Sequence, residues 1–188
     1  MNKTSDYVNF DTALNTGKKL LKDNKKCRLG FYIIFSINTG LRVSDILQTK
    51  HFMVVGDKMI VVEKKTKKSR EITINDEIKK AYAKLVLNLA EQKIKFNEND
   101  YIFISQKGSV YKTQSINEIL KTIFNSTSLQ ISSHSLRKSF ARRVYQNFNE
   151  SENALVLLSD IFSHSSIAIT RRYLGIRQET ISNVYLTL

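Results

Sequence analysis

Residues 39–45 read TGLRVSD, and this short stretch decides how the chain folds on either side of it. Residues 28–39 (RLGFYIIFSINT) lead into it, are mostly apolar and predict a buried helix. Gly40 stands where a left-handed residue would end that helix, and residues 43–50 (VSDILQTK) predict a short helix after it. Arg42 therefore lies between two predicted helices, with an acid, Asp45, three residues further on.

Beyond this turn the apolar residues change their period. MVV (53–55) and KMIVVE (58–63) flank Gly56-Asp57, a hairpin turn signal, and REITI (70–74) alternates polar and apolar residues. We expect three short antiparallel strands here. The sequence KKTKKS (64–69) is then a basic loop between the second strand and the third.

Helical periodicity accounts for most of the remaining chain. Helices are predicted over residues 9–24, 76–93, 113–126, 136–149, 151–161, 166–173 and 177–185. No linker or repeat divides the sequence, and 188 residues support one domain. The predicted fold class is α+β, mostly α-helical, with a small three-stranded antiparallel sheet in a single domain over residues 1–188.

The composition points to a polyanionic partner. Thirty Lys and Arg against 17 Asp and Glu leave a formal net charge of +13 and a pI near 9.8, a balance typical of nucleic-acid binding. The single cysteine, Cys27, excludes a disulfide framework, and with three histidines besides it we expect no metal cluster. No apolar run approaches the roughly 20 residues of a membrane span. We therefore expect a cytoplasmic protein with no membrane partner.

The positive charge collects in residues 18–28, 64–70, 137–143 and 171–177, which would have to converge to form one surface for DNA phosphates. Residues 64–70 carry five cations in seven positions, and these repel one another unless an anion is nearby. The side chains expected on the DNA backbone are Lys64, Lys67, Lys68, Arg70, Lys138, Arg171 and Arg172.

Two further stretches carry side chains suited to phosphate chemistry. His134 and Arg137, in HSLR (134–137), are three residues apart and share a helix face, and His164 is followed nine positions later by Tyr173. Arginines offer forked, permanently charged donors to phosphate oxygens, and fixed cations stabilise a phosphoryl transition state. A tyrosine hydroxyl can be the nucleophile of a covalent intermediate. The structural alternatives are ordinary: a capping arginine, a core histidine or a packing tyrosine.

Taken in order, these stretches resemble the signature boxes of the tyrosine recombinases, the phage integrase family. TGLRVSD at 39–45 matches the first box, and HSLR at 134–137, followed by KSFA, is similar to the second box, H-x-L-R. FSHSSIAITRRY at 162–173 resembles the third box, with the same spacing between its histidine and its tyrosine. The resemblance covers roughly residues 10–188 and includes the hairpin. Three boxes in order are specific, whereas any one alone is weak.

The resemblance implies a site-specific DNA recombinase or integrase of a mobile element, encoded by a prokaryote or a phage and associated with the nucleoid. It would cleave and rejoin double-stranded DNA through a 3′-phosphotyrosyl intermediate on Tyr173, with no cofactor or metal. It would act as a homotetramer on DNA, and we expect a monomer without DNA. The resemblance also implies that Arg42 and Arg137 clamp the phosphate. His134 and His164 would contact it, and His134 would also assist proton removal. Lys65 would be the general acid, and Asp45 would orient its neighbours.

The general acid must lie in the basic loop, and the residues do not settle which lysine it is. We choose Lys65, since a Lys-Thr pair at the start of this loop resembles many integrases, and Lys67 is the alternative. The sequence departs from the family at Phe162-Ser163, where Leu-Gly is commoner, and we expect little functional effect. The helical core-binding domain that precedes most catalytic domains of the family is expected to be absent.

Other functions stay open at this point. A type IB topoisomerase-like enzyme would use the same chemistry to relax DNA, but its lysine and arginine pattern fits the boxes less well. A DNA-binding remnant would keep the fold without catalysis, and against it stands the intact set Arg42, His134, Arg137, His164 and Tyr173. A general RNA-binding protein explains the charge and none of the boxes.

Overall fold

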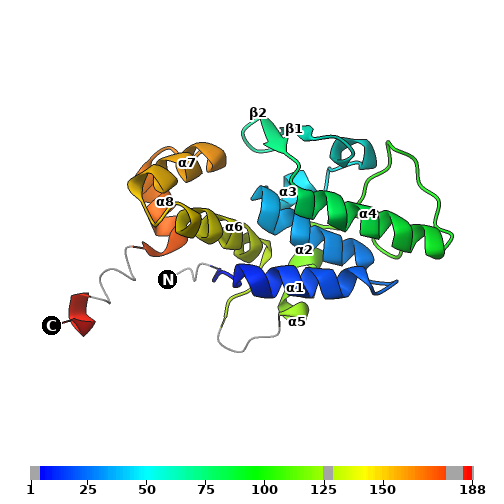
Figure 1. Cartoon of the computed structure of the whole chain (residues 1–188), viewed down its shortest axis with the longest axis horizontal. Coiled ribbons are helices and arrows are strands. Elements are labelled where there is room, and N and C mark those ends of the chain that lie inside the picture. Colours follow the sequence, from blue (N-terminus) through cyan, green and yellow to red (C-terminus); the bar gives the residue numbers. More distant parts are fainter. Residues whose placement is uncertain (1–4, 125–128, 177–183, 188) are drawn as a thin grey trace.

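A computed structural model describes residues 5–124, 129–176 and 184–187. The elements in these ranges, shown in Figure 1, are α1 (Phe10–Leu21), α2 (Cys27–Thr39), α3 (Val43–Ile46), the 3₁₀ helix η1 (His51–Val54), β1 (Lys58–Val62), β2 (Ser69–Thr73), α4 (Asp76–Glu91), α5 (Thr113–Ile123), α6 (Ser133–Asn147), α7 (Glu152–Phe162) and α8 (Ile167–Leu174). The predicted mostly helical domain with a small antiparallel sheet is confirmed. The described sheet has two strands, however, and not three.

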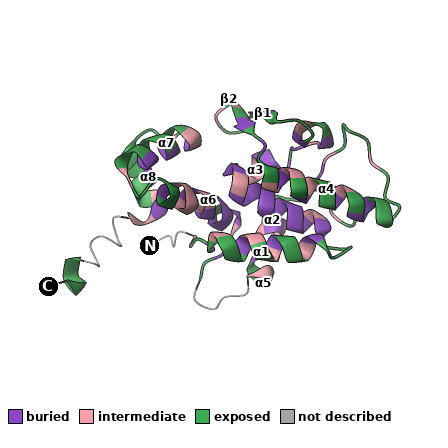
Figure 2. Cartoon of the chain, in the orientation of Figure 1, coloured by how far each residue is buried: buried purple, intermediate pink, exposed green. Residues whose placement is uncertain are grey.

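Helix α2 runs through the middle of the larger part of the molecule, and most of its residues are buried (Figure 2). Helix α1 packs against it so closely that Gly17 and Gly30 meet where the two helices cross. A Cβ on Gly30 would lie 2.5 Å from the backbone nitrogen of Leu21, so no larger residue fits. Helices α4 and α6 also pack on α2, which fixes the position of its C-terminal end.

The hairpin is an antiparallel pair in which Lys58 is opposite Thr73 and Val62 is opposite Ser69. Its inward-facing side chains, which include Met59, Val61 and Ile72, join the core. The basic loop therefore projects from the end of the hairpin, beside the upper end of α7 in Figure 1.

The strand predicted at 53–55 is wrong, because the chain forms the 3₁₀ helix η1 there. His51 and Val54 are both buried, and their separation of three residues is the period of a 3₁₀ helix. The backbone N–H of His51 donates to the carbonyl of Asp100 (3.1 Å), and its ring stacks on Phe96 with the ring centres 3.9 Å apart. These contacts tie η1 to a distant loop and keep the segment out of the sheet, and a three-residue apolar run does not reveal them.

The apolar core consists of two clusters that α6 connects. The larger one gathers side chains from α2, β1, α4 and α5 and includes Leu136 of α6. The smaller one joins Ala141 and Tyr145 of α6 to Leu158 and Phe162 of α7 and to the end of α8. Helices α7 and α8 consequently pack on the far half of α6, away from α2 (Figure 1).

The predicted helices agree with the observed ones in position and differ at their ends. The helix predicted over 43–50 ends at Ile46, and the one predicted over 136–149 begins at Ser133 because Ser132 and Ser135 form a capping box. Most of the helix predicted over 177–185 lies outside the described residues. None of the described helices has the length and the apolar character needed to cross a membrane.

Candidate active site

Arg42 follows the left-handed turn between α2 and α3. Gly40 ends α2 with a φ of 60°, as predicted, and a Cβ there would lie 2.4 Å from the ring of Phe140 on α6. The guanidinium of Arg42 donates through Nη1 to the carboxylate of Glu63 (2.6 Å) and through Nη2 to the backbone oxygen of Phe162 (3.2 Å). Arg42 thereby contacts both the hairpin and the end of α7.

Arg137, on α6, lies over the ring of Phe162 at the end of α7. It is 4% exposed, and the carbon of its guanidinium lies 4.2 Å from the centre of the Phe162 ring. Its Nη1 atom is buried and has no hydrogen-bond partner within the described residues. The pKa of Arg137 is lowered to about 10, mainly by burial. The charge of Arg42 contributes to this lowering, and Tyr173 acts in the opposite direction. Arg137 remains a cation at neutral pH and has a donor free for an anion.

Tyr173, on α8, lies against the same phenylalanine. Its ring centre is 5.5 Å from that of Phe162, with the rings edge to face. The Tyr173 hydroxyl is buried and finds no hydrogen-bond partner in the part of the chain that the structure describes. Burial raises the pKa of Tyr173 to about 12, although Arg137 and Arg42 act in the opposite direction. The phenol is therefore neutral, and it lies beside two arginines.

His164 is the third side chain on Phe162, with their ring centres 5.4 Å apart. Ser163 ends α7 in the left-handed conformation (φ 53°), and the next residue, His164, donates its N–H back to the last turn. The His164 Nδ1 atom lies 2.9 Å from the hydroxyl oxygen of the fully buried Thr170. Burial lowers the pKa of His164, and nearby arginines lower it further, so the imidazole is neutral at pH 7.

His134 and Lys138 lie in the first half of α6, near this site. Desolvation and the positive charges of its neighbours, Lys65 among them, lower the pKa of His134. The ammonium of Lys138 donates to the backbone oxygen of Ser5 (2.7 Å) and lies 5.3 Å from the centre of the Tyr173 ring. Lys138, expected on the DNA backbone, is thus next to the candidate nucleophile.

Two acids attach the basic loop to the site. Asp45 accepts a hydrogen bond through Oδ1 from the backbone N–H of Lys64 (2.9 Å). Glu63 accepts one through Oε2 from the hydroxyl of Thr66 (2.7 Å). Lys65 lies between these two attachments, and its own side chain is exposed.

The other cations that were expected on DNA have different surroundings. Arg70 donates to the backbone oxygens of Ile161 (3.1 Å) and Thr39 (3.0 Å), so it links the hairpin to the ends of α7 and α2. Arg171 forms an ion pair with Glu152 on the surface. The exposed side chains in this group also include Lys64, Lys67, Lys68 and Arg172.

Glu63 and Phe162, which are central to this arrangement, did not emerge from the sequence motifs as site residues. A signal for Glu63 existed, because Met59, Val61 and Glu63 alternate along one face and place the acid at a core-facing position. A charged residue is rare at such a position unless it is paired. Phe162 carried no comparable signal, since buried aromatic residues are common at helix ends.

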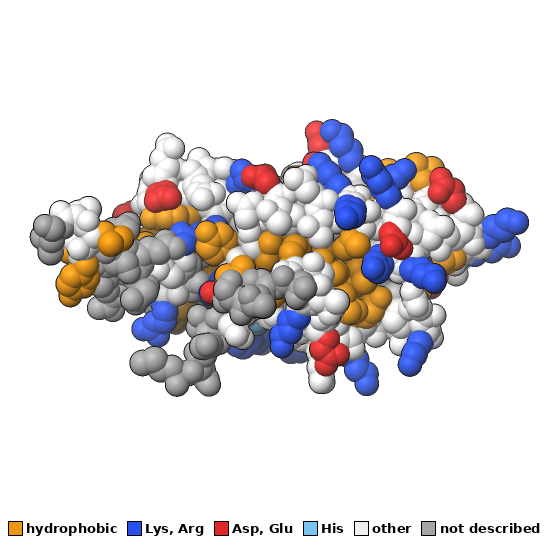
Figure 3. All heavy atoms as spheres, turned by 90° about the horizontal axis from the view of Figure 1, so that it is seen from below, with side chains coloured by type: hydrophobic (Ala, Val, Ile, Leu, Met, Phe, Trp, Pro, Cys, Tyr) orange, Lys and Arg blue, Asp and Glu red, His pale blue; other side chains and the backbone are white. Residues whose placement is uncertain are grey.

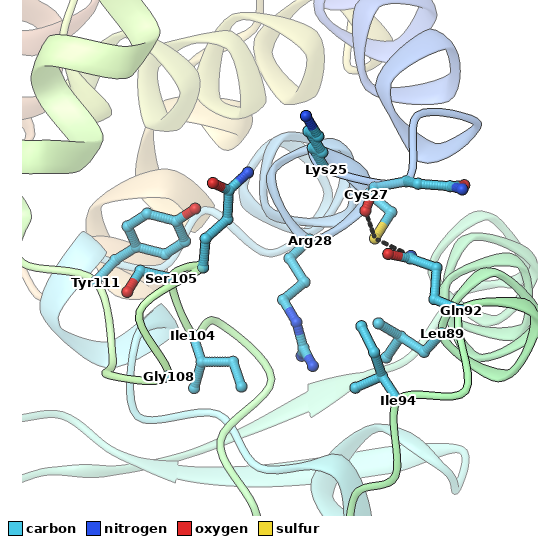
Figure 4. A pocket seen from close by; sticks show the side chains of 12 residues that line it. Lys25, Cys27, Arg28, Leu89, Gln92, Ile94, Ile104, Ser105, Gly108 and Tyr111 are labelled. Carbon is cyan, nitrogen blue, oxygen red and sulfur yellow. Dashed lines mark hydrogen bonds between the residues drawn. The ribbon is translucent and has the colours of Figure 1, made fainter.

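A pocket at the other end of α2, roughly 20 Å away along the helix axis, belongs to a different part of the fold. Figure 4 shows Arg28 reaching between Ile104 and Ile94. Its Nη1 donates to the backbone oxygen of Ile102 (2.5 Å), and the thiol of Cys27 accepts a weak hydrogen bond from Gln92 (4.0 Å). None of the residues expected in the site lines this pocket, and Arg28 has the structural task of tying the 100–111 segment to α2.

Basic side chains also occur far from the site. The face in Figure 3 is the side of α1 and α5, and its Lys and Arg side chains are interspersed with acids and apolar groups. The convergence around Phe162 is therefore more specific than surface charge. No group of three or more His, Cys, Asp or Glu suited to a metal ion occurs among the described residues.

The model of the phage integrase family matches residues 9–179. The chain therefore belongs to this family, that of the tyrosine recombinase catalytic domains. It is 33% identical over 166 residues to the probable integrase/recombinase YoeC of Bacillus subtilis (strain 168), a match that covers 86% of this chain and 85% of YoeC. Tyrosine recombinase XerC of Leptospira interrogans is 23% identical over 188 residues, 98% of this chain and 56% of XerC.

Solved structures share the fold. XerH site-specific recombinase, in a post-cleavage complex with palindromic difH substrate, gives a TM-score of 0.72 at 20% identity over 98% of this chain and 53% of XerH. XerA recombinase gives 0.69 at 19% identity over 100% of this chain and 66% of XerA. The chain thus spans about half the length of XerC and XerH.

Proposed function

We propose that this chain is a DNA strand transferase, the catalytic domain of a site-specific recombinase or integrase with Tyr173 as its nucleophile. The observation that carries the proposal is that two polar groups without partners in the described residues, Arg137 Nη1 and the Tyr173 hydroxyl, are buried around one ring, Phe162. Burying such groups costs free energy unless a ligand satisfies them. A phosphodiester offers acceptor oxygens to both.

In the proposed cleavage step, the phenolic oxygen of Tyr173 bonds to phosphorus while the bond from phosphorus to the 5′-oxygen breaks. The products are a 3′-phosphotyrosyl link and a free 5′-hydroxyl. The phenolic proton passes to His134, and the leaving 5′-oxygen takes a proton from the ammonium of Lys65. Attack by a 5′-hydroxyl reverses each transfer, so the energy of the broken bond is returned on rejoining.

Arg42, Arg137 and His164 are proposed to hold the non-bridging oxygens of the phosphate. These oxygens gain charge in the transition state, so donors fixed beforehand lower the barrier. If the Thr170 hydroxyl donates to Nδ1 of His164, the imidazole proton resides on Nε2. A neutral His164 can then donate to phosphate.

The pKa of Tyr173, raised by burial to about 12, explains why a base is needed. The phenol is protonated in the DNA-free chain, and a phosphate beside it adds negative charge that opposes ionisation. His134 is suited to accept the proton because its lowered pKa keeps it uncharged at neutral pH. This division of roles leaves Lys65 free to act at the opposite side of the phosphorus.

The proposed partner is double-stranded DNA, bound by four copies of the chain during strand exchange and by a monomer when DNA is absent. Support comes from the net charge of +13 and from solved relatives, since XerH was solved with difH substrate and Tn1549 transposon integrase with transposon right end DNA. Residues 1–188, of which the family model matches 9–179, would form a single catalytic domain that acts on DNA in the bacterial cytoplasm.

The test is covalent capture on suicide duplexes, nicked so that the cleaved strand loses its short end and cannot be rejoined. The duplexes are taken from the flanks of the chain's own gene, and adducts are detected on denaturing gels. Wild type is compared with Tyr173→Phe and with Tyr145→Phe, a matched change on α6 outside the site.

An adduct with wild type and Tyr145→Phe that is absent with Tyr173→Phe supports the proposal. An adduct that persists in Tyr173→Phe contradicts the assigned nucleophile. Wild type that binds the duplex without forming an adduct contradicts strand transfer and favours a DNA-binding protein. Relaxation of supercoiled DNA without strand exchange between duplexes would identify the topoisomerase-like activity.

A further inference from the structure

Glu63 places a buried carboxylate beside the cations of the site, on the opposite side of Lys65 from the buried acid Asp45. It follows the last residue of β1 and is 1% exposed. Burial raises the pKa of its carboxyl, but hydrogen bonds from Thr66 and Arg42 outweigh burial and leave the pKa below its usual value. Glu63 is therefore ionised at neutral pH, next to the place proposed for a DNA phosphate.

A carboxylate in that place repels phosphate, so its contacts must serve another purpose. Its Oε2 atom accepts from Nη1 of Arg42 at 2.6 Å and from the hydroxyl of Thr66 at 2.7 Å. One oxygen atom thus connects an arginine of the first sequence box to the residue that follows Lys65. Charge-assisted bonds of this length hold a long side chain in one orientation.

The loop around Lys65 is fixed on both of its sides. Before Lys65, the backbone N–H of Lys64 donates to Asp45, and after it, the side chain of Thr66 donates to Glu63. The loop also closes on Glu63 itself, whose backbone oxygen accepts from the N–H of Lys67 (2.8 Å). The contacts of Glu63 therefore set where the Lys65 side chain begins.

We propose that Glu63 is a positioning residue that joins Arg42 to the loop carrying Lys65. One carboxylate then sets both the cation that holds the phosphate and the ammonium that protonates the leaving oxygen. The inference rests on the proposed strand-transfer function and adds to it a residue that does not touch the reacting atoms.

The experiment compares two suicide duplexes that differ in one atom. In one duplex the scissile phosphate has its natural bridging 5′-oxygen, and in the other a sulfur atom replaces that oxygen. A thiolate leaves without a proton, so the sulfur duplex does not require Lys65. The variants are Glu63→Gln, Thr66→Val and, as a matched control, Glu71→Gln, which removes an exposed charge from the same hairpin.

Cleavage of the oxygen duplex by Glu63→Gln should be slower by about 10- to 100-fold, as for a displacement of catalytic groups. The loss should be clearly smaller on the sulfur duplex, where only the Arg42 part of the defect remains. Thr66→Val should be slow on the oxygen duplex and match wild type on the sulfur duplex. Glu71→Gln should match wild type on both. DNA binding, measured separately, should change little in any variant.

Equal losses on the two duplexes, or rates equal to wild type, overturn the joining role of Glu63. If Glu63→Gln does not fold, as judged by circular dichroism, Thr66→Val decides the question. It leaves the bond between Glu63 and Arg42 in place and removes two contacts of the loop, the bond to Glu63 and a longer one from the backbone N–H of Lys68 (3.4 Å). Wild type that cleaves neither duplex refutes the proposed function, and the role of Glu63 falls with it. If wild type cleaves both duplexes and Glu63→Gln loses the same factor in rate on each, the role of Glu63 is refuted and the proposed function stands.

Discussion

Replacing Phe162 by leucine tests whether this ring supports the site through the guanidinium of Arg137. Phe162 is fully buried, and it contacts the rings of Phe140, His164 and Tyr173 at centre distances of 6.1, 5.4 and 5.5 Å. In addition, the guanidinium of Arg137 lies 4.2 Å from the ring centre. Leucine keeps an apolar side chain there and removes the aromatic face.

The magnitude follows from a comparison with Phe31 in the larger cluster. Phe31 is equally buried and also has three ring neighbours, at 5.6, 5.7 and 5.7 Å, but no Lys or Arg side chain of the described residues lies over its ring. Aromatic pairs contribute about 0.5–1.5 kcal/mol each, and this part is common to Phe162→Leu and Phe31→Leu. A desolvated guanidinium over a ring contributes about 1–2 kcal/mol. Phe162→Leu should therefore cost about 1–2 kcal/mol more.

The assay is urea denaturation followed by far-ultraviolet circular dichroism, because the chain has no tryptophan to report by fluorescence. The slopes of the transitions are compared to verify that both variants unfold the same structure, since the two phenylalanines lie in different clusters. If Phe162→Leu costs the same as Phe31→Leu or less, the ring is ordinary core packing and does not support Arg137.

Three further outcomes are expected. Tyr173→Phe removes a buried hydroxyl that has no partner in the described residues, so urea denaturation should show stability unchanged or raised by about 1 kcal/mol, and a clear loss would show that the hydroxyl is bonded. Gly40→Ala puts a side chain at φ 60° and 2.4 Å from the ring of Phe140, which should cost about 2–4 kcal/mol; an unchanged Tm would refute that strain. Burial lowers the pKa of His51 from 6.5 to about 4. Its neutral form stabilises the fold fully above pH 6.5, and this stabilisation is lost as the pH falls through 4, so His51→Gln should flatten the pH dependence of Tm in that window.

The helices were predictable because their apolar residues recur with the helical period over long stretches and their ends carry local signals. Gly40 is an example, since a glycine after an apolar helix indicates a left-handed end and the structure has one. Such signals lie within a few residues of the feature they predict. The side chains of the three boxes also converge, because α6 packs on α2 and on α7.

What the sequence did not reveal depends on partners distant in the chain. Residues 53–55 have strand-forming side chains, yet the neighbouring His51 is held by Phe96 and Asp100, which are distant in the sequence. Glu63 likewise acquires its importance from Arg42, which lies on another element. Such tertiary contacts override the local preference for a strand, and no short motif encodes them.

The balance of charge in the site argues for a structure prepared for one more anion. The guanidiniums of Arg42, Arg70 and Arg137 act on one another, and the carboxylates of Glu63 and Asp45 act on Arg70 as well. Arg42 and Arg70 donate hydrogen bonds to backbone oxygens of the protein, whereas Nη1 of Arg137 has no partner in the described residues. A cluster in which every donor was satisfied would have to break contacts before it could bind phosphate. On the proposed function, a phosphate would add contacts at Arg137 while Glu63 continued to hold Arg42, so the cost of reorganisation would be small and the donors would already be in place for the transition state.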